Sequence, residues 1–159
     1  MTPPIRVLVL CTGNSARSQM AEALIQTMGK GRFLAESAGS QPAPRVNPHA
    51  MRVLAEAGID WSGRTPRAVA DLDLSGWDLV ITVCNDAQEA CPVFPGGTVT
   101  AHWGQPDPAA VTGTDGERLA AFREALATLR RRVDRLLALP LTREGLSGFW
   151  EVIGRIGRG

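Results

Sequence analysis

The feature that most constrains this chain is the segment 7–22, in which an apolar run ends at Cys11 and a helical pattern begins at Ser18. Residues 5–10 form a short β-branched and leucine run without polar alternation, which is typical of a parallel strand buried on both faces. The helical pattern ends at Gly29. We therefore expect a strand, a tight polar loop and a helix arranged around one thiol.

The loop between strand and helix has the composition of an anion cradle. Its small and polar residues tolerate unusual backbone angles, so that the backbone N–H groups can turn inward. The dipole of the following helix adds partial positive charge, which attracts an oxyanion and favours a thiolate over a thiol. The predicted oxyanion-binding residues are Thr12, Gly13, Asn14, Ser15, Ala16 and Arg17.

Three residues of this loop carry the predicted chemistry. Cys11 is the nucleophile, and the planar guanidinium of Arg17 would bind two oxygens of the anion. Ser18 can donate a hydrogen bond to the Cys11 thiolate, cap the helix, or do both. The pattern thus indicates covalent chemistry on a phosphate-like oxyanion. A nucleotide-binding loop is excluded because G-x-x-x-x-G-K-[ST] is absent, and the alternative is an inert buried cysteine at a strand end.

Strand and helix patterns alternate along the rest of the chain. Strand patterns recur at residues 33–38, 78–83 and 98–102, and helical patterns at 47–57 and 117–139. Such alternation predicts right-handed βαβ units. The expected fold class is therefore α/β, a single three-layer domain with a four-stranded parallel sheet flanked by helices, counting the strand at 5–10.

Three further residues are candidates for chemistry. Cys84 ends the strand at 78–83, and Cys91 follows it at a spacing that does not fit a zinc knuckle. A disulfide needs Cα atoms within about 7 Å, whereas seven residues of helix separate them by about 10 Å, so pairing requires local unfolding. The alternatives are two buried spectator thiols, or a metal site that includes His102. Asp107, between two prolines, is either a turn residue or a rigidly held carboxylate.

Composition limits the classes of function. The 159 residues carry a formal net charge of +1, which argues against a general nucleic-acid binder. No apolar run approaches the roughly 20 residues of a membrane span, and no signal peptide is recognisable. Three cysteines, an odd number, in a reducing compartment indicate reactive or buried thiols and not a structural disulfide framework. We expect a cytoplasmic monomer with no cofactor, no metal, and no nucleic-acid or membrane partner.

The segment CTGNSARSQMAEA resembles the Cys-x5-Arg loop of the low-molecular-weight protein tyrosine phosphatase superfamily, and is most similar to its thioredoxin-coupled arsenate reductases. The resemblance continues through AESAGSQPAPRVNPHAM, LVITVCNDAQEACP and AHWGQPDPA. It fades after about Pro140. We accordingly assign residues 1–139 to a catalytic phosphatase-like domain and 140–159 to a C-terminal tail of uncertain structure, in which glycines weaken any helix by roughly 1 kcal/mol each.

The resemblance implies a mechanism and a set of partners. Cys11 would attack arsenate while Asp107 protonates the leaving oxygen. Cys84 would then attack the Cys11 adduct and release arsenite, and Cys91 would take over the disulfide from Cys11. Thioredoxin is the implied reductant, with a mycothiol or glutaredoxin system as substitutes.

Two other functions stay open at this point. A low-molecular-weight protein tyrosine phosphatase would use the same Cys-x5-Arg loop but would leave Cys84 and Cys91 idle. The chain also has no tyrosine, and that branch often lines its phosphotyrosine pocket with a tyrosine pair. A non-catalytic oxyanion or redox sensor would use the loop for binding and the thiols for signalling.

One departure from the resemblance concerns potassium. Some thioredoxin-coupled arsenate reductases hold this ion through an Asn, a Glu, a Ser and an Asp. The first three match Asn14, Glu22 and Ser37, whereas Arg67 stands where the Asp would be. Our hypothesis is that the Arg67 guanidinium pairs with Glu22 and replaces the ion.

Overall fold

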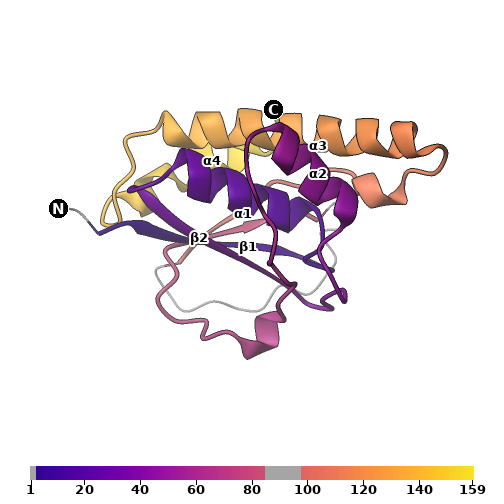
Figure 1. Cartoon of the computed structure of the whole chain (residues 1–159). Coiled ribbons are helices and arrows are strands. Elements are labelled where there is room, and N and C mark those ends of the chain that lie inside the picture. Colours follow the sequence, from indigo (N-terminus) through magenta and orange to yellow (C-terminus); the bar gives the residue numbers. More distant parts are fainter. Residues whose placement is uncertain (1–2, 85–97) are drawn as a thin grey trace.

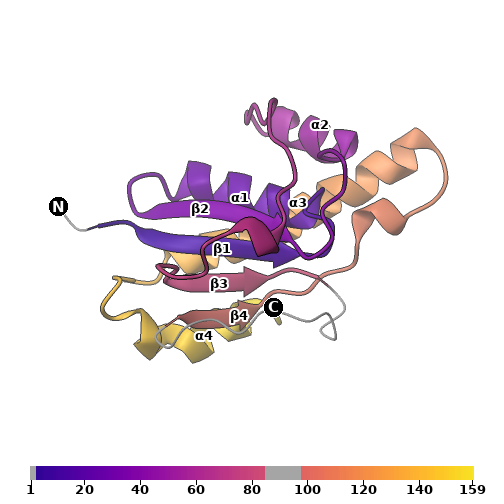
Figure 2. The ribbon, with the colours of Figure 1, turned by 90° about the horizontal axis from the view of Figure 1, so that it is seen from below.

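The computed structural model describes residues 3–84 and 98–159, so that the predictions for Cys91 lie outside the described residues. The elements, in chain order, are β1 (Ile5–Cys11), α1 (Arg17–Met28), β2 (Phe33–Gly39), α2 (Pro48–Glu56), the 3-10 helix η1 (Val69–Asp71), β3 (Leu79–Thr82), β4 (Val99–His102), η2 (Pro108–Ala110), α3 (Asp115–Leu137), η3 (Leu146–Phe149) and α4 (Trp150–Ile156). The strands form one parallel sheet in the order β2-β1-β3-β4 (Figure 2). The predicted α/β fold is confirmed.

The sheet separates two apolar layers, because successive side chains of a strand point to opposite faces. Val7 and Val9 of β1 face the larger core, which includes residues of α1 and α3 such as Leu24 and Leu129. Leu8 and neighbouring side chains form a smaller cluster on the other face. Figure 1 shows α1 and α3 on one side of the sheet and η1 on the other. The second face is thus covered by a largely extended segment.

Local sequence explains where two of the helices begin. The side chain of Asn47 accepts a hydrogen bond from the His49 N–H at 2.9 Å, and Pro48 follows as the first residue of α2. α3 begins two residues before the predicted start because Thr114 and Glu117 form a reciprocal capping box. Each cap satisfies backbone N–H groups that lack a partner within the helix.

The segment 140–159 continues the fold as η3 and α4. Ile153 and Ile156 are buried in the main core, and the indole N–H of Trp103 donates to the Ile153 carbonyl at 2.9 Å. Figure 2 shows α4 beside β4. Trp150, the first residue of α4, does not share this buried side, since 57% of it is exposed. Gly154 within α4 and Gly157 at its C-cap do not prevent this helix, because tertiary packing outweighs the low helix propensity of glycine.

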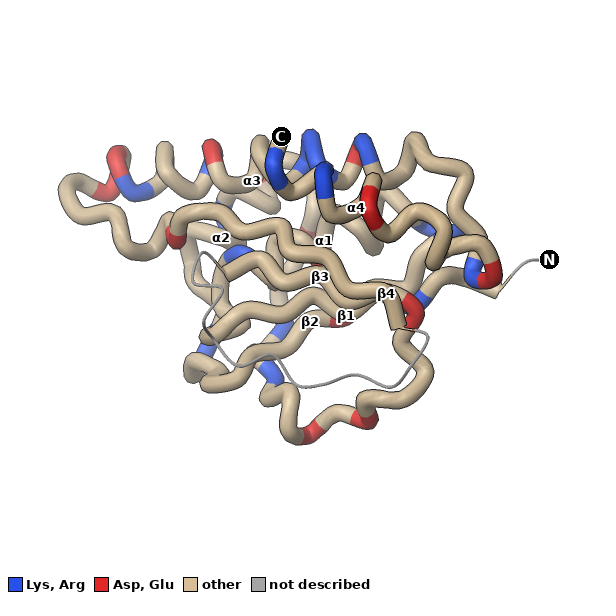
Figure 3. The backbone as a smooth tube through the Cα atoms, turned by 180° about the vertical axis from the view of Figure 1, so that it is seen from behind, with Lys and Arg blue, Asp and Glu red and all other residues tan. Residues whose placement is uncertain are grey.

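Positively charged residues are concentrated on the part of the molecule where α3 and α4 are in contact. Figure 3 shows arginine positions gathering where α4 lies against α3. Among the described residues, no helix is long and apolar enough to cross a membrane.

The parallel arrangement places two cysteines at the same edge of the sheet. Cys11 is the last residue of β1, and Cys84 follows the neighbouring strand β3 by two residues. Ligands of open parallel sheets bind outside the carboxyl ends of the strands. The fold therefore brings the predicted nucleophile and the second thiol to the expected position for a site.

Candidate active site

The loop after β1 surrounds the Cys11 sulfur with hydrogen-bond donors. The Asn14 N–H donates to Sγ at 3.2 Å, and the Ser18 hydroxyl lies 2.8 Å from it. Asn14 adopts a left-handed backbone angle, φ 51°, which turns this N–H inward and which asparagine tolerates better than most residues. The predicted contact between Ser18 and Cys11 is present. Ser18 is not the helix cap, because α1 begins at Arg17 with Ala16 in the cap position.

The side chain of Asn14 fixes the direction of the Ser18 hydrogen bond. Its Oδ1 accepts from the Arg67 N–H at 2.9 Å and from Gln19 Nε2 at 3.1 Å, so that its Nδ2 must act as the donor. That Nδ2 donates to the Ser18 hydroxyl oxygen at 2.7 Å. Since the hydroxyl oxygen is the acceptor there, its single proton is free to point at the Cys11 sulfur. The network thus presents a donor to a thiolate.

The same network continues to a buried carboxylate. Asn14 Nδ2 also donates to the Ser37 hydroxyl at 2.9 Å, and Ser37 donates onward to Glu22 Oε1 at 2.6 Å. Burial raises the pKa of Glu22, while the Ser37 hydrogen bond and the Arg64 charge act in the opposite direction. Apart from Arg64, these groups lie on β1, α1 or β2 or on the loop between β1 and α1. The Asn14 and Ser18 donors to the Cys11 sulfur therefore come from the loop and helix that directly follow it.

Cys84 has the largest influence on the acidity of Cys11. A hydrogen bond from the Cys84 side chain, opposed by burial and supported by Ser18 and the Asn14 N–H, lowers the pKa of Cys11 from 9.0 to about 6. Cys84 is itself buried, and its Sγ lies 3.7 Å from the Thr12 hydroxyl oxygen. At neutral pH Cys11 is consequently a thiolate, with a second sulfur beside it.

Arg17, the first residue of α1, contacts the segment that follows β4. Arg17 Nη1 donates to the Gln105 carbonyl at 3.0 Å, and its Nη2 lies 3.8 Å from Asp107 Oδ2. The other oxygen of Asp107 accepts from the Ala109 N–H at 2.9 Å and caps η2. Asp107 is thus a turn residue and also directs one carboxylate oxygen toward the predicted anion-binding residue. Its side chain is 45% exposed.

The hypothesis for Arg67 is wrong. Arg64 pairs with Glu22, with Nη1 3.3 Å from Oε2, whereas the Arg67 guanidinium pairs with Glu36 at 3.3 Å. The backbone explains the difference, because the Arg67 N–H is bound to Asn14 and its carbonyl accepts from the Gly39 N–H. These bonds hold residue 67 against the end of β2. Arg64 lies instead over the ring of Trp61, with its guanidinium carbon 3.9 Å from the ring centroid.

The groups that would hold potassium do not fit the ion here. Asn14 Oδ1 already accepts two hydrogen bonds, and the Glu22 carboxylate is shared between Ser37 and the cationic Arg64. A cavity of about 300 Å³ adjoins them, and both Arg64 and Arg67 line it. A second cation would meet repulsion from both guanidinium groups. In the described part of the chain, no three His, Cys, Asp or Glu side chains are placed to hold a metal ion.

Three residues that the sequence reading missed contribute to this site. Gln19 accepts from the Trp61 indole N–H at 2.8 Å and donates to Asn14, and the backbone of Gln105 holds Arg17. A glutamine on a helix or in a proline turn has no distinctive sequence pattern. Arg64 lies three residues before Arg67, the residue that the family resemblance indicated, and the path of the backbone decides which of the two reaches Glu22.

Comparison with known proteins places these features in context. The family model of the low molecular weight phosphotyrosine protein phosphatases matches residues 6–145. An arsenate reductase of Halalkalibacterium halodurans is 39% identical over 127 residues, which are 80% of this chain and 91% of that protein. A glutaredoxin arsenate reductase of Synechocystis sp. is 32% identical over 133 residues, 84% of this chain and 96% of that protein. The crystal structure of an Archaeoglobus fulgidus arsenate reductase has a TM-score of 0.69 and 36% identity, and the match covers 84% of this chain and 99% of that one.

Proposed function

Because this chain belongs to the low molecular weight phosphotyrosine protein phosphatase family, we propose that it is an arsenate reductase that uses Cys11, Cys84 and Cys91 in a thiol–disulfide relay. The observation that supports the proposal is the position of Cys84, which follows the strand next to β1 and whose Sγ lies 3.7 Å from the hydroxyl oxygen of Thr12, the residue after Cys11. Phosphate-ester hydrolysis needs one thiol, whereas reduction of arsenate needs two electrons and hence two. The names of the similar proteins support the same assignment.

The first step uses the residues that surround Cys11. Arsenate enters as an oxyanion, bound by the inward backbone N–H groups of residues 12–17 and by Arg17. The Cys11 thiolate attacks arsenic, a sulfur–arsenic bond forms, and one arsenic–oxygen bond breaks. Asp107 donates the proton that lets this oxygen leave as water. Arsenic is still pentavalent at this point.

Reduction occurs in the second step. The Cys84 sulfur, after losing its proton, attacks the Cys11 sulfur and forms a Cys11–Cys84 disulfide. The sulfur–arsenic bond breaks and its electron pair stays on arsenic, which leaves as arsenite. The two electrons come from the two thiols, so that one disulfide forms for each arsenate reduced.

The enzyme returns to its starting state through Cys91. Its thiolate attacks Cys84, regenerates Cys11 and leaves a Cys84–Cys91 disulfide for an external thiol reductant. We propose thioredoxin as this reductant, with a glutaredoxin or mycothiol system as the alternative. The relative named as a glutaredoxin arsenate reductase supports a thiol reductant in general.

A phosphatase is the second candidate, and a specific observation favours it. Arg17 Nη2 and Asp107 Oδ2 lie 3.8 Å apart, and these two groups together with the Cys11 thiolate are sufficient for hydrolysis of a phosphate ester. Such an enzyme would use the first step and then let water attack the phosphocysteine. Slow ester hydrolysis is therefore expected as a side activity of the reductase.

Coupled assays separate the candidates. NADPH oxidation that depends on arsenate is measured with thioredoxin and its reductase, and separately with glutaredoxin and mycothiol systems, beside hydrolysis of p-nitrophenyl phosphate. We expect arsenate-dependent turnover with one of these donors. Cys84→Ser should abolish that turnover and lower ester hydrolysis only several-fold. Efficient hydrolysis without arsenite formation by any donor would identify a phosphatase and contradict the proposal.

A further inference from the structure

Arg132 of α3 is a buried cation whose partners are backbone carbonyls. It is 7% exposed. Its Nη1 donates to the carbonyls of Trp103 at 2.9 Å and Gly104 at 3.3 Å, and its Nη2 donates to the Gly157 carbonyl at 3.0 Å. Burial, aided by the nearby charges of Arg131 and Arg135, lowers the pKa of Arg132. Within the described residues it makes no ion pair with a carboxylate.

Burial of a charged side chain in a core is energetically unfavourable. An apolar side chain of similar volume generally packs at least as favourably as a buried charge. What a guanidinium adds is geometry, because its planar donors fix the positions of several acceptors at once. Arg132 thus joins α3, the end of β4 and the C-terminal segment in one arrangement.

The carbonyls that Arg132 holds lead directly into the site. Gly104 is followed by Gln105, whose carbonyl accepts from Arg17, and then by Asp107, which faces Arg17. Gly104 also packs closely on the strand that carries the second thiol, since a Cβ added to it would lie 3.0 Å from the Cys84 carbonyl oxygen. A small shift of residues 103–104 would therefore be passed on to both partners of Arg17.

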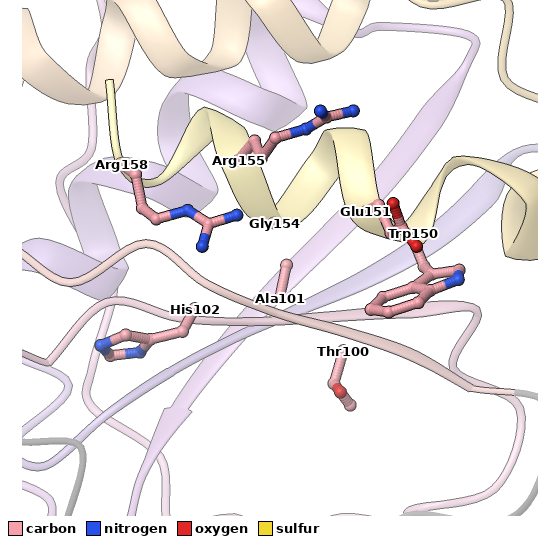
Figure 4. A pocket seen from close by; sticks show the side chains of 8 residues that line it. All are labelled: Thr100, Ala101, His102, Trp150, Glu151, Gly154, Arg155 and Arg158. Carbon is pink, nitrogen blue, oxygen red and sulfur yellow. The ribbon is translucent and has the colours of Figure 1, made fainter.

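The C-terminal segment is the third element that Arg132 joins, and it packs tightly on residues 102–103 at Gly157 but not at Gly154. Gly157 packs so tightly on His102 and Trp103 that an added Cβ would lie 2.7 Å from the Trp103 ring. Elsewhere along α4 a cavity of about 490 Å³ lies between the helix and β4, and Gly154 lines it with nothing within 4 Å of an added Cβ (Figure 4). Residues after 145 also lie outside the family match.

We propose that Arg132 is a positioning residue that, together with the C-terminal segment, fixes residues 103–107 so that the Gln105 carbonyl and the Asp107 carboxylate face Arg17. The proposal rests on the proposed function for the role of Asp107 as proton donor. It assigns a part in catalysis to a segment that the family match does not include.

Two variants with matched controls test the proposal. Arg132→Met removes the guanidinium, and Arg131→Met removes an exposed arginine next to it on α3. Gly157→Ala displaces the C-terminal segment without changing Arg132, and Gly154→Ala adds the same methyl group to the same helix facing the cavity. Three quantities are measured well below the melting temperature: the phosphate concentration that half-protects Cys11 from alkylation, kcat for arsenate, and the rate of p-nitrophenyl phosphate hydrolysis.

We expect Arg132→Met and Gly157→Ala to weaken protection by phosphate several-fold and to lower both rates roughly tenfold, since small displacements of catalytic groups have effects of this order or larger. The two controls should stay within twofold of the parent. In an Asp107→Asn background, Arg132→Met should lower the two rates by a much smaller factor, because the carboxylate that Arg132 positions is already absent.

A merely structural Arg132 would lower the melting temperature and leave binding and rates of the folded protein unchanged. A change in melting temperature alone would overturn the proposal. Additive effects of Arg132→Met and Asp107→Asn on the rates would also overturn it, as would loss of folding in both test variants. Phosphate protection and ester hydrolysis require only one thiol. They remain readable if the parent protein fails to reduce arsenate, so that failure of the proposed function is distinguished from failure of this one.

Discussion

The two halves of the site are built in different ways. The half around Cys11 is a buried network in which Asn14 and Ser18 each make several hydrogen bonds, and both are fully buried. The half around Asp107 is more open. The Asp107 side chain is 45% exposed and lies 3.8 Å from Arg17, whose guanidinium also donates to the Gln105 carbonyl, 88 residues away in the chain.

This difference separates two tasks of the enzyme. A thiolate with a lowered pKa must exist before substrate arrives, so its donors are fixed by neighbouring elements. A proton donor and an anion-binding arginine have to meet a substrate that enters and leaves, and more exposure allows this. We expect substitutions in the Cys11 half to change the reactivity of the thiol with or without a bound oxyanion. Substitutions in the Asp107 half should change only the reaction of a bound oxyanion.

The largest effect should come from Cys11→Ser. A serine hydroxyl is not ionised at neutral pH, and loss of the nucleophile should abolish both arsenate reduction and ester hydrolysis. Oxyanion binding should persist, because the backbone N–H groups and Arg17 remain. Phosphate binding by calorimetry and both activity assays check this. Measurable turnover of either substrate by the variant would show that Cys11 is not the nucleophile.

Asp107→Asn should have the next largest effect. We expect the rate of chemistry to fall roughly 10²- to 10⁴-fold, the usual contribution of a general acid, while oxyanion binding changes little. The Asn side chain can still accept from the Ala109 N–H, so that the turn is preserved. Single-turnover rates between pH 6 and 8 provide the measurement. If the variant keeps the rates of the parent protein throughout that range, Asp107 is a turn residue and not the general acid.

Ser18→Ala tests the network around the thiol and should act more mildly. The pKa of Cys11 is about 6, so the rate of alkylation by iodoacetamide should rise through pH 6 and level off above it. Loss of one donor disfavours the thiolate, which moves the midpoint upward and lowers the rate at pH 6 several-fold. The plateau at pH 9 should be unchanged. An unaltered midpoint would mean that Ser18 does not donate to the sulfur.

The smallest effect concerns potassium. An ion that binds only the folded state raises its stability by about 2.7 kcal/mol at a hundredfold excess over Kd, which shifts the melting temperature by several degrees. Because Arg64 already pairs with Glu22, we expect the same melting temperature and turnover in potassium chloride and tetramethylammonium chloride of equal ionic strength. A clear rise that is specific to potassium would show that the ion binds despite Arg64.

Sequence patterns predicted the fold well because its signals are local. A buried strand ending at Cys11, helical spacing from Ser18, and the cap formed by Asn47 depend on residues close together in the chain. The start of α3 was missed by two residues because the pattern was read from apolar spacing and not from the cap at Thr114. The packing of 140–159 could not be predicted, since its glycines disfavour a helix that packing against β4 and α3 stabilises.

The site residues could likewise be predicted where their signals are local in the sequence. Cys11, Arg17, Ser18, Cys84 and Asp107 were predicted from the loop pattern, the strand ends and the family resemblance. The structure places Ser18 beside Cys11, Cys84 beside Thr12 and Asp107 beside Arg17. Arg64 and Gln105 were not, because their roles depend on the path of backbone segments far from the loop. The direction of the Ser18 hydrogen bond likewise follows from Asn14, whose own partners come from three separate segments.

The most direct test of the relay is made with Cys91→Ser and arsenate in the absence of reductant. We expect one arsenite released per protein molecule and a Cys11–Cys84 disulfide, identified by peptide mapping after the thiols are blocked. With thioredoxin and its reductase present, the variant should then fail to turn over. Steady multiple turnover by this variant, or arsenite release without a disulfide at Cys11, would contradict the relay.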